Sequence, residues 1–411
     1  MSSFSIAVAG MLANEEALGM ISNNLANMNT VGYKTQSPEF SDLVYQQMGT
    51  SGGGDPIQIG LGSQIGSTST NYTEGSIQST GVPTNVAIQG GGFLQVQTNG
   101  LNAYTRDGDL TINSNGYLVT QNGGLVMGYG APNGVVQSSG VLQPLVINSN
   151  QTSPGQPTQN VTIGLNLNAA TPAGQSFSTT AQVYDSLGNS HLLTYTFTNT
   201  AANSWSYQIT IPGADVGQTN PVVVNSGTLT FNGNGTLTAP TSNVTGIKVS
   251  GLADGANTMN FAWNLYDSSN NPVITQVASP SSPSSVQQDG YSSGTLVNYT
   301  IGSDGTIQGT FSNGRTVPVG QIALATFPNS EGLLHIGSNE FISTLASGLP
   351  AIGTPGTGGR GTITDGALEN SNVDIADQFA QLISAQNGYQ SNTKSFSTIN
   401  TVIQDTFNLI P

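Results

Sequence analysis

Residues 375–410 read IADQFAQLISAQNGYQSNTKSFSTINTVIQDTFNLI. Large apolar residues return at every seventh position of this stretch, and Phe379 and Phe407 widen the apolar stripe. The seven-residue series is Ile375, Leu382, Tyr389, Phe396, Ile403 and Ile410. Such a repeat predicts a long helix that offers a coiled-coil seam. Ser371 and Asp374 have the S-x-x-D spacing of a capping box, so we expect the helix to begin there.

The first thirty residues carry a matching repeat. Its two series lie three residues apart, like the a and d positions of a coiled coil. They are Phe4, Met11, Leu18 and Leu25, and then Ala7, Asn14, Ile21 and Met28. The repeat stops near Thr30 and Gly32, where we expect a second helix to end.

Both terminal segments are poor in charge. Residues 1–30 contain Glu15 and Glu16, and residues 371–411 contain a few more charges: Asp374, Asp377, Lys394 and Asp405. Neutral polar faces suit burial in a polymer, because an unpaired buried charge costs several kcal/mol. We therefore expect the two ends to pack on each other and on further copies. The alternative is a pair of ordinary core helices.

The overall composition excludes several classes of protein. The 411 residues include 6 Lys and Arg against 21 Asp and Glu, for a net charge of −15. So few basic residues cannot form a phosphate-neutralising patch or an electrostatic membrane anchor, so neither nucleic-acid nor lipid binding is expected. No uninterrupted apolar run reaches ~20 residues, and the start lacks the basic region of a signal peptide. We expect no membrane insertion and no cleaved leader.

The middle of the chain has the pattern of antiparallel β-structure. Apolar residues alternate with polar ones in three places: Leu193, Tyr195 and Phe197; Trp205, Tyr207, Ile209 and Ile211; and Phe261, Trp263 and Leu265. Turn pairs recur in residues 93–130, at Asn99-Gly100, Asp107-Gly108, Asn115-Gly116 and Asn122-Gly123. Such pairs are typical of hairpins whose glycines have positive φ.

Two Pro- and Ser-rich stretches, 148–160 and 279–290, predict domain boundaries. The expected fold class is mixed α and β and multi-domain, with a helical coiled-coil domain and two nested, mainly antiparallel β domains. The expected domains are 1–31 with 371–411 (helical), 32–74 with 361–370 (an extended connecting segment), 75–147 with 285–360 (β), and 160–279 (an inserted outer β domain).

Candidate chemistry is sparse. Residues 290–294, GYSSG, fit a G-x-S-x-G elbow followed by Asp304 and His335, but the continuation predicts strand, turn and strand where the elbow needs a helix. His191 has no partner nearby in the sequence, and Asp107 with Asp109 fits a turn better than a calcium loop. Arg106 could pair with these aspartates or across a subunit contact. We expect no catalytic, cofactor-binding or metal-binding residues.

Three long motifs then point to a family. SNNLANMNTVGYK (22–34), GGGFLQV (90–96) with YTRDGDLTINSNGYLVTQNG (104–123), and LENSNVDIADQFAQLISAQNGYQSNTKSF (368–396) resemble the bacterial flagellar rod and hook proteins in content and order. Gly-Tyr-Lys at 32–34 replaces the commoner Gly-Phe-Lys. The residues that carry the terminal motifs are Asn23, Asn24, Asn27, Gly32, Ser371, Asn372 and Asp374.

The central insertion favours the hook members of this family. FSTTAQVYDSLGNSHLLTYTF (177–197) is similar to their outer domain and residues 288–327 to their return strands, whereas rod members lack a large insertion. The resemblance implies a structural subunit without cofactor, exported unfolded by the flagellar apparatus. Copies would polymerise into a curved tube that transmits torque as a universal joint.

The resemblance also implies partners and assembly residues. The partners would be further copies, the distal rod protein, the hook cap, the hook–filament junction protein and the export apparatus. The assembly helices would use Phe4, Met11, Leu18, Ile21, Leu25, Ile375, Phe379, Leu382, Tyr389, Phe396, Ile403 and Ile410. The alternatives are a distal rod protein, a phage-tail or adhesin-like fibre and, less compatible with the heptads, a secreted polysaccharide-cleaving enzyme.

Overall fold

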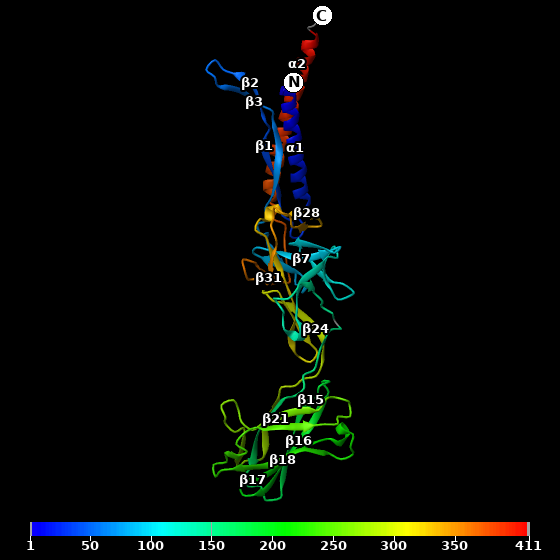
Figure 1. Cartoon of the computed structure of the whole chain (residues 1–411), viewed down its shortest axis with the longest axis vertical. Coiled ribbons are helices and arrows are strands. Elements are labelled where there is room, and N and C mark those ends of the chain that lie inside the picture. The colour runs from blue at the N-terminus through cyan, green and yellow to red at the C-terminus, as the bar shows by residue number, and fades with distance from the viewer. Residues whose placement is uncertain (1, 149, 409–411) are drawn as a thin grey trace. The chain divides into compact units, whose positions relative to one another are not determined.

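Figure 1 shows a computed structural model of the chain, which describes residues 2–148 and 150–408. The chain forms two compact units. The first unit comprises residues 1–148, 299–309 and 317–411, and the second comprises residues 149–298 and 310–316. This division is coarser than the four segments expected from composition, whose boundaries stay a prediction. Most of the chain is β-structure with one long helix near each end, which confirms the mixed, mainly β character.

The two helices lie side by side in the first unit (Figure 1). Helix α1 spans Ser2–Ala26 and helix α2 spans Ile375–Asn408. They are antiparallel, because the Phe4 ring lies 4.5 Å from that of Phe396 near one end and Asn24 hydrogen-bonds Gln378 near the other.

Helix α2 begins later than the capping-box prediction. Its N-cap is Asp374, whose Oδ1 accepts hydrogen bonds from the backbone N–H groups of Ala376 at 2.8 Å and Asp377 at 3.2 Å. Ser371 Oγ accepts one long bond of 3.4 Å from the N–H of Val373. The predicted cap at Ser371 was wrong, because Asp374 itself caps the first turn as an N-cap aspartate does.

Short antiparallel pairs connect the helices to the main sheet of the first unit. β1 (Gln36–Asp42) pairs with β4 (Ser63–Thr70), and β2 (Tyr45–Thr50) pairs with β3 (Pro56–Gly60) in a projecting hairpin (Figure 1). β5 (Ile77–Ser79) pairs with β32 (Ala367–Glu369), and β6 (Val86–Gln89) pairs with β31 (Thr362–Asp365). The last two pairs hold the chain just before α2 against the segment that follows β4.

The main sheet of the first unit contains the path β26-β11-β7-β8-β29-β28. Its strands are β7 (Phe93–Thr98), β8 (Leu101–Thr105), β9 (Leu110–Ile112), β10 (Leu118–Thr120), β11 (Leu125–Gly130), β12 (Gln143–Pro144), β26 (Thr316–Ile322), β27 (Leu324–Thr326), β28 (Leu334–Gly337), β29 (Glu340–Ile342) and β30 (Ala351–Gly353). β24 (Gly294–Ile301), β25 (Thr306–Phe311) and β26 each run across the division between the units. An aromatic cluster fills the core below β7 and β8: Tyr72, Phe93, Tyr104, Phe327 and Phe341.

The turn predictions hold in part. Asn99 (φ 51°) and Gly100 (φ 80°) join β7 to β8 with two positive φ angles, as a type I′ hairpin requires. Gly116 and Gly123 also have positive φ. Gly108 does not, and the hairpin prediction there was wrong. A Cβ at Gly108 would collide with the carbonyl oxygen of Val86, so a close backbone approach explains this glycine.

The second unit is a sandwich of two sheets. One has the order β20-β21-β14-β22 with β23 on β14, and the other has the order β15-β16-β17-β18-β19. The strands of the first sheet are β14 (Asn160–Asn168), β20 (Val244–Val249), β21 (Met259–Asn264), β22 (Ile274–Val277) and β23 (Ser282–Gln288). Those of the second are β15 (Ser176–Tyr184), β16 (Ser190–Ala201), β17 (Ser204–Ile211), β18 (Val222–Phe231) and β19 (Leu237–Ala239). β13 (Thr152–Ser153) precedes them.

The predicted alternation is confirmed in the core of this sandwich. Trp263 lies within 5.3 Å of the Tyr195 ring and 5.0 Å of the Tyr207 ring, measured between centroids. The expected antiparallel pairing of the Trp263 strand is incomplete, because β21 pairs antiparallel with β20 but parallel with β14. A parallel neighbour needs a long crossover, and the whole second sheet lies between β14 and β21 in the chain.

Helix α1 differs from expectation in one respect. Over Phe4–Ala26 it is long and apolar enough, by length and composition alone, to cross a membrane. The polar residues Asn14, Glu15 and Glu16 add two charges, which are too few to lower the mean hydropathy of the helix below that of a membrane span. Helix α2 covers one side of α1 in the folded chain, so the apolar composition has a use in helix packing.

Candidate assembly site

Small residues form the contact between α1 and α2. Buried residues of α1 include Ala7, Gly10, Ala17, Ile21 and Asn24. Ala17 and Ile21 pack on Ala385, with Leu18, Leu25 and Leu382 beside them. Small side chains let the two backbones approach closely at Gly10, Ala17, Ala385 and Gly388, and a few larger side chains pack beside these positions.

Two glycines and two asparagines interlock across this strip. A Cβ at Gly10 would lie 2.7 Å from the Asn392 side chain, and a Cβ at Gly388 would lie 2.5 Å from that of Asn14. Each asparagine also donates to the glycine carbonyl one turn earlier on its own helix, Asn14 to Gly10 at 2.6 Å and Asn392 to Gly388 at 3.0 Å. The same G-x-x-x-N arrangement therefore occurs on both helices and fixes their register.

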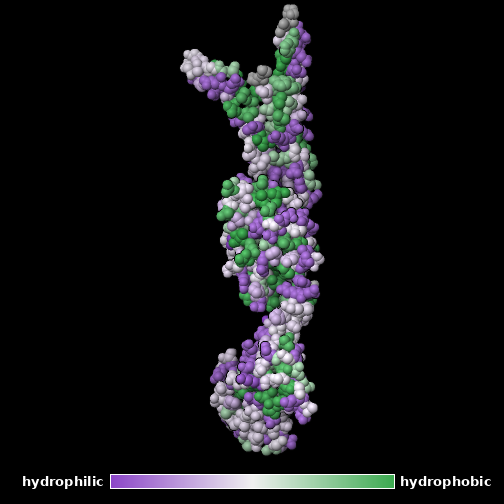
Figure 2. Space-filling model, turned by 45° about the vertical axis from the view of Figure 1, so that its right-hand side comes forward, coloured by the Kyte–Doolittle hydropathy of each residue, from purple (hydrophilic) through white to green (hydrophobic). Residues whose placement is uncertain are grey.

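The predicted assembly residues divide between two faces. Leu18, Ile21, Leu25 and Leu382 contribute to the contact within the chain, and Phe4 stacks on Phe396. Met11 lies beside Thr393, whose hydroxyl is 3.3 Å from its sulfur. A second set of the predicted residues is exposed: Ile375, Phe379, Tyr389 and Ile403. Four further apolar residues are also exposed: Leu12, Ile383, Val402 and Phe407. Ile410 lies outside the described residues. Figure 2 shows hydrophobic residues on the surface of this helix pair.

The β2–β3 hairpin adds a second apolar surface. Its exposed large apolar residues, with the preceding Phe40, are Val44, Tyr45, Met48, Ile57 and Ile59. All six residues of β2 are exposed. Near the strand that leads to this hairpin, a groove of about 310 Å³ is lined by residues of α1, α2 and β1, among them Ile21, Phe40 and Ala385. The first unit thus offers both projecting apolar side chains and a recess.

Asn24 ties the end of α1 to its neighbours. Its Oδ1 accepts from the Gln36 N–H at 3.1 Å and the Tyr33 hydroxyl at 3.0 Å. Its Nδ2 donates to the Gln36 carbonyl at 2.7 Å and to Gln378 Oε1 at 2.9 Å. The buried amide therefore uses both of its donors and both lone pairs of its oxygen, joining α1, α2 and the start of β1. Asn23 donates to Tyr33 on the exposed side, and Asn27 donates back to the Asn23 carbonyl.

Asn24→Asp should destabilise this joint by about 2–4 kcal/mol, because a carboxylate would face two acceptor oxygens in a buried site. The matched control is Asn23→Asp, one residue earlier and exposed. Amide hydrogen exchange of residues 20–40 measures the effect. Equal exchange in the two variants would contradict this role of Asn24.

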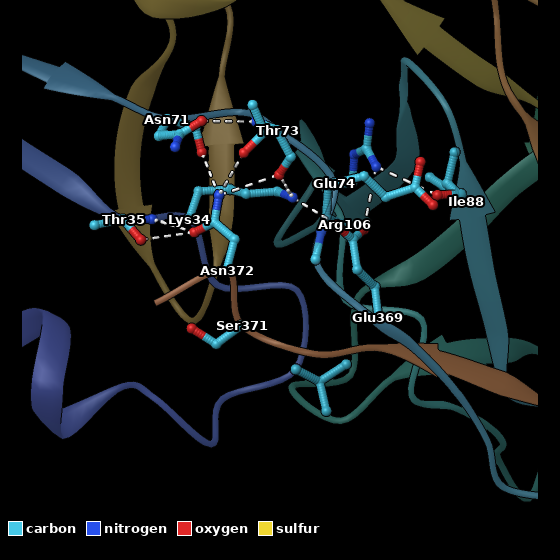
Figure 3. Close-up of polar contacts among 12 residues, drawn as sticks. Lys34, Thr35, Asn71, Thr73, Glu74, Ile88, Arg106, Glu369, Ser371 and Asn372 are labelled. Carbon is cyan, nitrogen blue, oxygen red and sulfur yellow. Dashed lines mark hydrogen bonds and ion pairs between the residues drawn. The ribbon is translucent and has the colours of Figure 1, made fainter. Parts of the chain in front are cut away.

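A buried ionic cluster joins both chain ends to the main sheet (Figure 3). Glu369 lies at its centre, with Oε1 at 2.5 Å from Lys34 Nζ and Oε2 at 3.1 Å from Arg106 Nη1. The Gly75 N–H also donates to Oε1 at 2.9 Å. Lys34 and Glu369 have no solvent-exposed side-chain area. The Glu369 carboxylate thus links its own strand, β32, to the segment after α1 and to the end of β8.

The two cations of this cluster also hold backbone carbonyls. Lys34 donates to the Thr73 carbonyl at 2.7 Å, and Arg106 donates to the Gly90 carbonyl at 2.6 Å. Burial lowers the pKa of Lys34 more than the adjacent Glu369 carboxylate raises it. The ion pair therefore does not fully offset the cost of burying the ammonium, as is common for buried pairs. The contribution of the Lys34–Glu369 pair is to fix the position of the segment after α1 against β32.

The remaining motif residues complete the junction. Asn372 Oδ1 accepts from the Thr35 N–H at 2.8 Å and the Thr35 hydroxyl at 2.7 Å, and its Nδ2 donates to the Asn71 carbonyl at 2.8 Å. Gly32 has φ of 67° and donates to the Glu369 carbonyl at 2.7 Å. A Cβ there would lie 2.7 Å from the Arg106 backbone, so both conformation and space require glycine.

Sequence reasoning missed the centre of this cluster. Lys34 and Glu369 stand in the quoted motifs, but nothing in their spacing signals that they meet. Arg106 pairs with Glu369 and not with Asp107 or Asp109, the local partners considered from the sequence. The prediction that His191 has no partner is wrong, because Asp185, Asp215 and Asp254 surround it in the folded chain.

Comparison with known families covers most of the chain. Residues 4–34 match the model described as flagella basal body rod protein, and residues 87–168 match the flagellar hook protein FlgE/F/G D1 domain. Residues 147–291 match the flagellar basal body protein FlaE D2 domain, and residues 364–409 match the flagellar basal body rod FlgEFG protein C-terminal region.

Curated relatives extend over nearly the full length. The flagellar hook protein FlgE of Treponema pallidum is 33% identical, covering 98% of both chains, and that of Salmonella typhimurium is 33% identical, covering 99% of this chain and 100% of its own. A crystal structure of Helicobacter pylori flagellar hook protein FlgE2 aligns with 71% of this chain and 100% of its own, at 16% identity and a TM-score of 0.49. The chain belongs to the family of flagellar hook proteins.

Proposed function

We propose that this chain is the structural subunit of a flagellar hook, a tube of identical copies that bends while it transmits torque from rod to filament. Helices α1 and α2 form a coiled-coil layer that lines the tube, and the β units form its outer layers. The family is structural, so no catalysis is invoked. The subunit works outside the cell, after export by the flagellar apparatus.

One observation carries the proposal. Helix α2 has 34 residues, of which Gln378 and Ala385 are buried in the single chain. Large apolar side chains on the same helix remain open to water: Ile383 is 57% exposed, Val402 is 58% exposed and Phe407 is 69% exposed. A monomer gains nothing from such a surface, and contiguous exposed apolar surface marks an interaction site. Further copies of the same helix pair and hairpin provide matching apolar surface.

Charge supports a partner of the same kind. The exposed side of α2 contains mostly neutral Ser, Thr, Asn and Gln, with Lys394 and Asp405 among its few charges. Burial of such a surface requires little desolvation of ions. Between identical copies with net charge −15, neutral contact faces also avoid concentrating like charges.

The surface of the second unit suits contacts that change during bending. Its strands turn Ser and Thr outward, as where Ser178 and Thr196 hydrogen-bond across β15 and β16 at 3.0 Å. Neutral hydroxyls exchange protein partners for water at little net cost. We infer that such contacts let neighbouring copies slide, whereas the close-packed helices keep their register.

The partners of this function are further copies, the distal rod protein, the hook cap protein, the hook–filament junction protein and the export apparatus. The full-length match to hook relatives favours a hook over a distal rod protein. A phage-tail or adhesin-like fibre would instead form stable trimers.

Purified full-length chain tests the proposal. Analytical ultracentrifugation should show a monomer at low concentration, and electron microscopy should show tubes once polymerisation is induced by concentration or precipitating salt. Tubes with a hollow centre are expected because the helices form an inner layer. A stable trimer at all concentrations, or the absence of any polymer, would contradict a hook subunit.

A further inference from the structure

A buried histidine in the second unit faces three carboxylates that come from separate loops. His191 is the second residue of β16 and is 7% exposed. Its Nε2 lies 3.2 Å from Asp185 Oδ2 and 3.6 Å from Asp254 Oδ2, and its Nδ1 lies 3.0 Å from Asp215 Oδ2. Asp185 follows β15, Asp215 lies in the short helix Gly213–Val216, and Asp254 lies between β20 and β21.

We propose that Asp185, His191 and Asp254 bind one divalent transition-metal cation of the zinc class, with Asp215 holding the imidazole in place. All four residues lie in the second unit, so none belongs to the helix pair or to the β2–β3 hairpin.

The first argument concerns lone pairs. If the Nδ1–H donates to Asp215, the unprotonated Nε2 points its lone pair at two carboxylate oxygens. Such an arrangement is repulsive unless a cation lies between the three atoms. Within residues 2–148 and 150–408, no Lys or Arg forms an ion pair with these carboxylates.

The second argument concerns spacing. Ligands bound at 2.0–2.2 Å in a tetrahedral shell stand roughly 3.3–3.6 Å apart. The two distances from Nε2, 3.2 and 3.6 Å, lie close to the ends of that range, and all three ligand atoms lie within 4.8 Å of one another. Asn189 donates to Oδ2 of both carboxylates, at 3.4 Å for Asp185 and 3.0 Å for Asp254, which holds the two oxygens toward the same point.

The third argument concerns ligand type and access. A histidine that binds a metal usually donates its other ring N–H to a carboxylate, and Asp215 is placed for this role. One imidazole with carboxylates favours zinc-like ions, whereas magnesium and calcium prefer oxygen ligands alone. Asp254 is 27% exposed, so a water molecule can complete the shell and an ion can enter.

The experiment uses the full chain, stripped with EDTA and titrated with zinc chloride by calorimetry. We expect one ion per chain with a dissociation constant in the micromolar range or tighter, and cobalt(II) should give the visible absorption of a tetrahedral site. Millimolar magnesium should not compete. Asp254→Asn should weaken binding at least 100-fold, and Asp215→Asn by about 10- to 100-fold.

Asp267→Asn is the matched control. Asp267 accepts hydrogen bonds from the N–H groups of Ser269 and Asn271, as Asp185 does from Leu187 and Asn189, but no histidine faces it. This variant should bind one ion as tightly as the unaltered chain. No saturable uptake by the unaltered chain would overturn the proposal, and so would equal uptake by Asp254→Asn. In either case the positive charge among these carboxylates would be that of a protonated His191 and not that of a metal ion.

Discussion

Glu369→Gln should destabilise the first unit by about 3–5 kcal/mol while leaving the second unit unchanged. The amide keeps the size of the side chain and can still accept from the Gly75 N–H. It removes the negative charge that lies between Lys34 and Arg106, at 2.5 and 3.1 Å. Two buried cations would then face each other without their shared counter-ion, and removal of one partner from a buried pair is far more costly than removal of the whole pair.

Lys34→Met should cost much less, about 1 kcal/mol, at the same cluster. Its loss leaves Glu369 paired with Arg106, and it removes an ammonium whose pKa burial already lowers. The Thr73 carbonyl keeps a donor in Asn372 Nδ2, at 3.1 Å. The two single variants and the double variant form a cycle, in which we expect Lys34→Met to recover part of the loss caused by Glu369→Gln.

Hydrogen exchange measured by mass spectrometry reads both units in one sample. Peptides from residues 29–40, 86–110 and 362–372 should lose roughly 100- to 4,000-fold of their protection in Glu369→Gln. Peptides from β16 and β17 should not change. The exposed Glu39→Gln serves as the charge-matched control. If Lys34→Met and Glu369→Gln lowered the free energy of unfolding equally, the negative charge of Glu369 would not be what stabilises the two cations.

The helices were predictable because their signal is local. A seven-residue repeat is visible in any window of residues 375–410, so a long helix at each end follows from the sequence. Which face meets the partner does not follow. The series with the largest side chains includes Ile375 and Ile403, both exposed, whereas the contact uses Gly10, Ala17 and Gly388. Periodicity marks an apolar stripe, and only the close approach of two backbones selects the small residues.

The ionic junction could not be predicted in the same way. Lys34 and Glu369 are separated by 335 positions, and their contact depends on β32 pairing with β5 and on the turn at Gly32. In a chain where 7% of residues are charged, a buried charge is a feature worth testing for partners. The sequence does not say which charges are buried, so it singles out neither Lys34 nor Glu369.

The His191 cluster was missed for a related reason. Its carboxylates come from three loops, whereas a metal motif in the sequence needs ligands at short fixed spacings. Asp185 and His191 lie six positions apart, whereas Asp254 joins them only because β20 and β16 belong to the two facing sheets of one sandwich. The alternation of β16 predicts that His191 points inward with Leu193 and Tyr195, and a buried histidine calls for a partner.

Ile383→Glu should abolish polymerisation while leaving the single chain folded. Ile383 is 57% exposed on α2, so a glutamate there meets water in the monomer. In the proposed tube the same position is covered by another copy, and burial of an unpaired carboxylate costs several kcal/mol. Since 1.4 kcal/mol is a factor of ten in an equilibrium constant, the critical concentration should rise at least 100-fold.

The neighbouring residue gives the decisive comparison. Leu382 packs beside Ala17 and Ile21 within the chain, so Leu382→Glu should open the helix pair of the monomer and lower its helical circular dichroism. Ile383→Glu should keep that signal and lose only the pelletable polymer. Val223→Glu, at an apolar position that is 49% exposed on β18, controls for an added charge and should polymerise normally. Polymer formation by Ile383→Glu at the concentration of the unaltered chain would show that this face of α2 stays in water, which would contradict the proposed assembly surface.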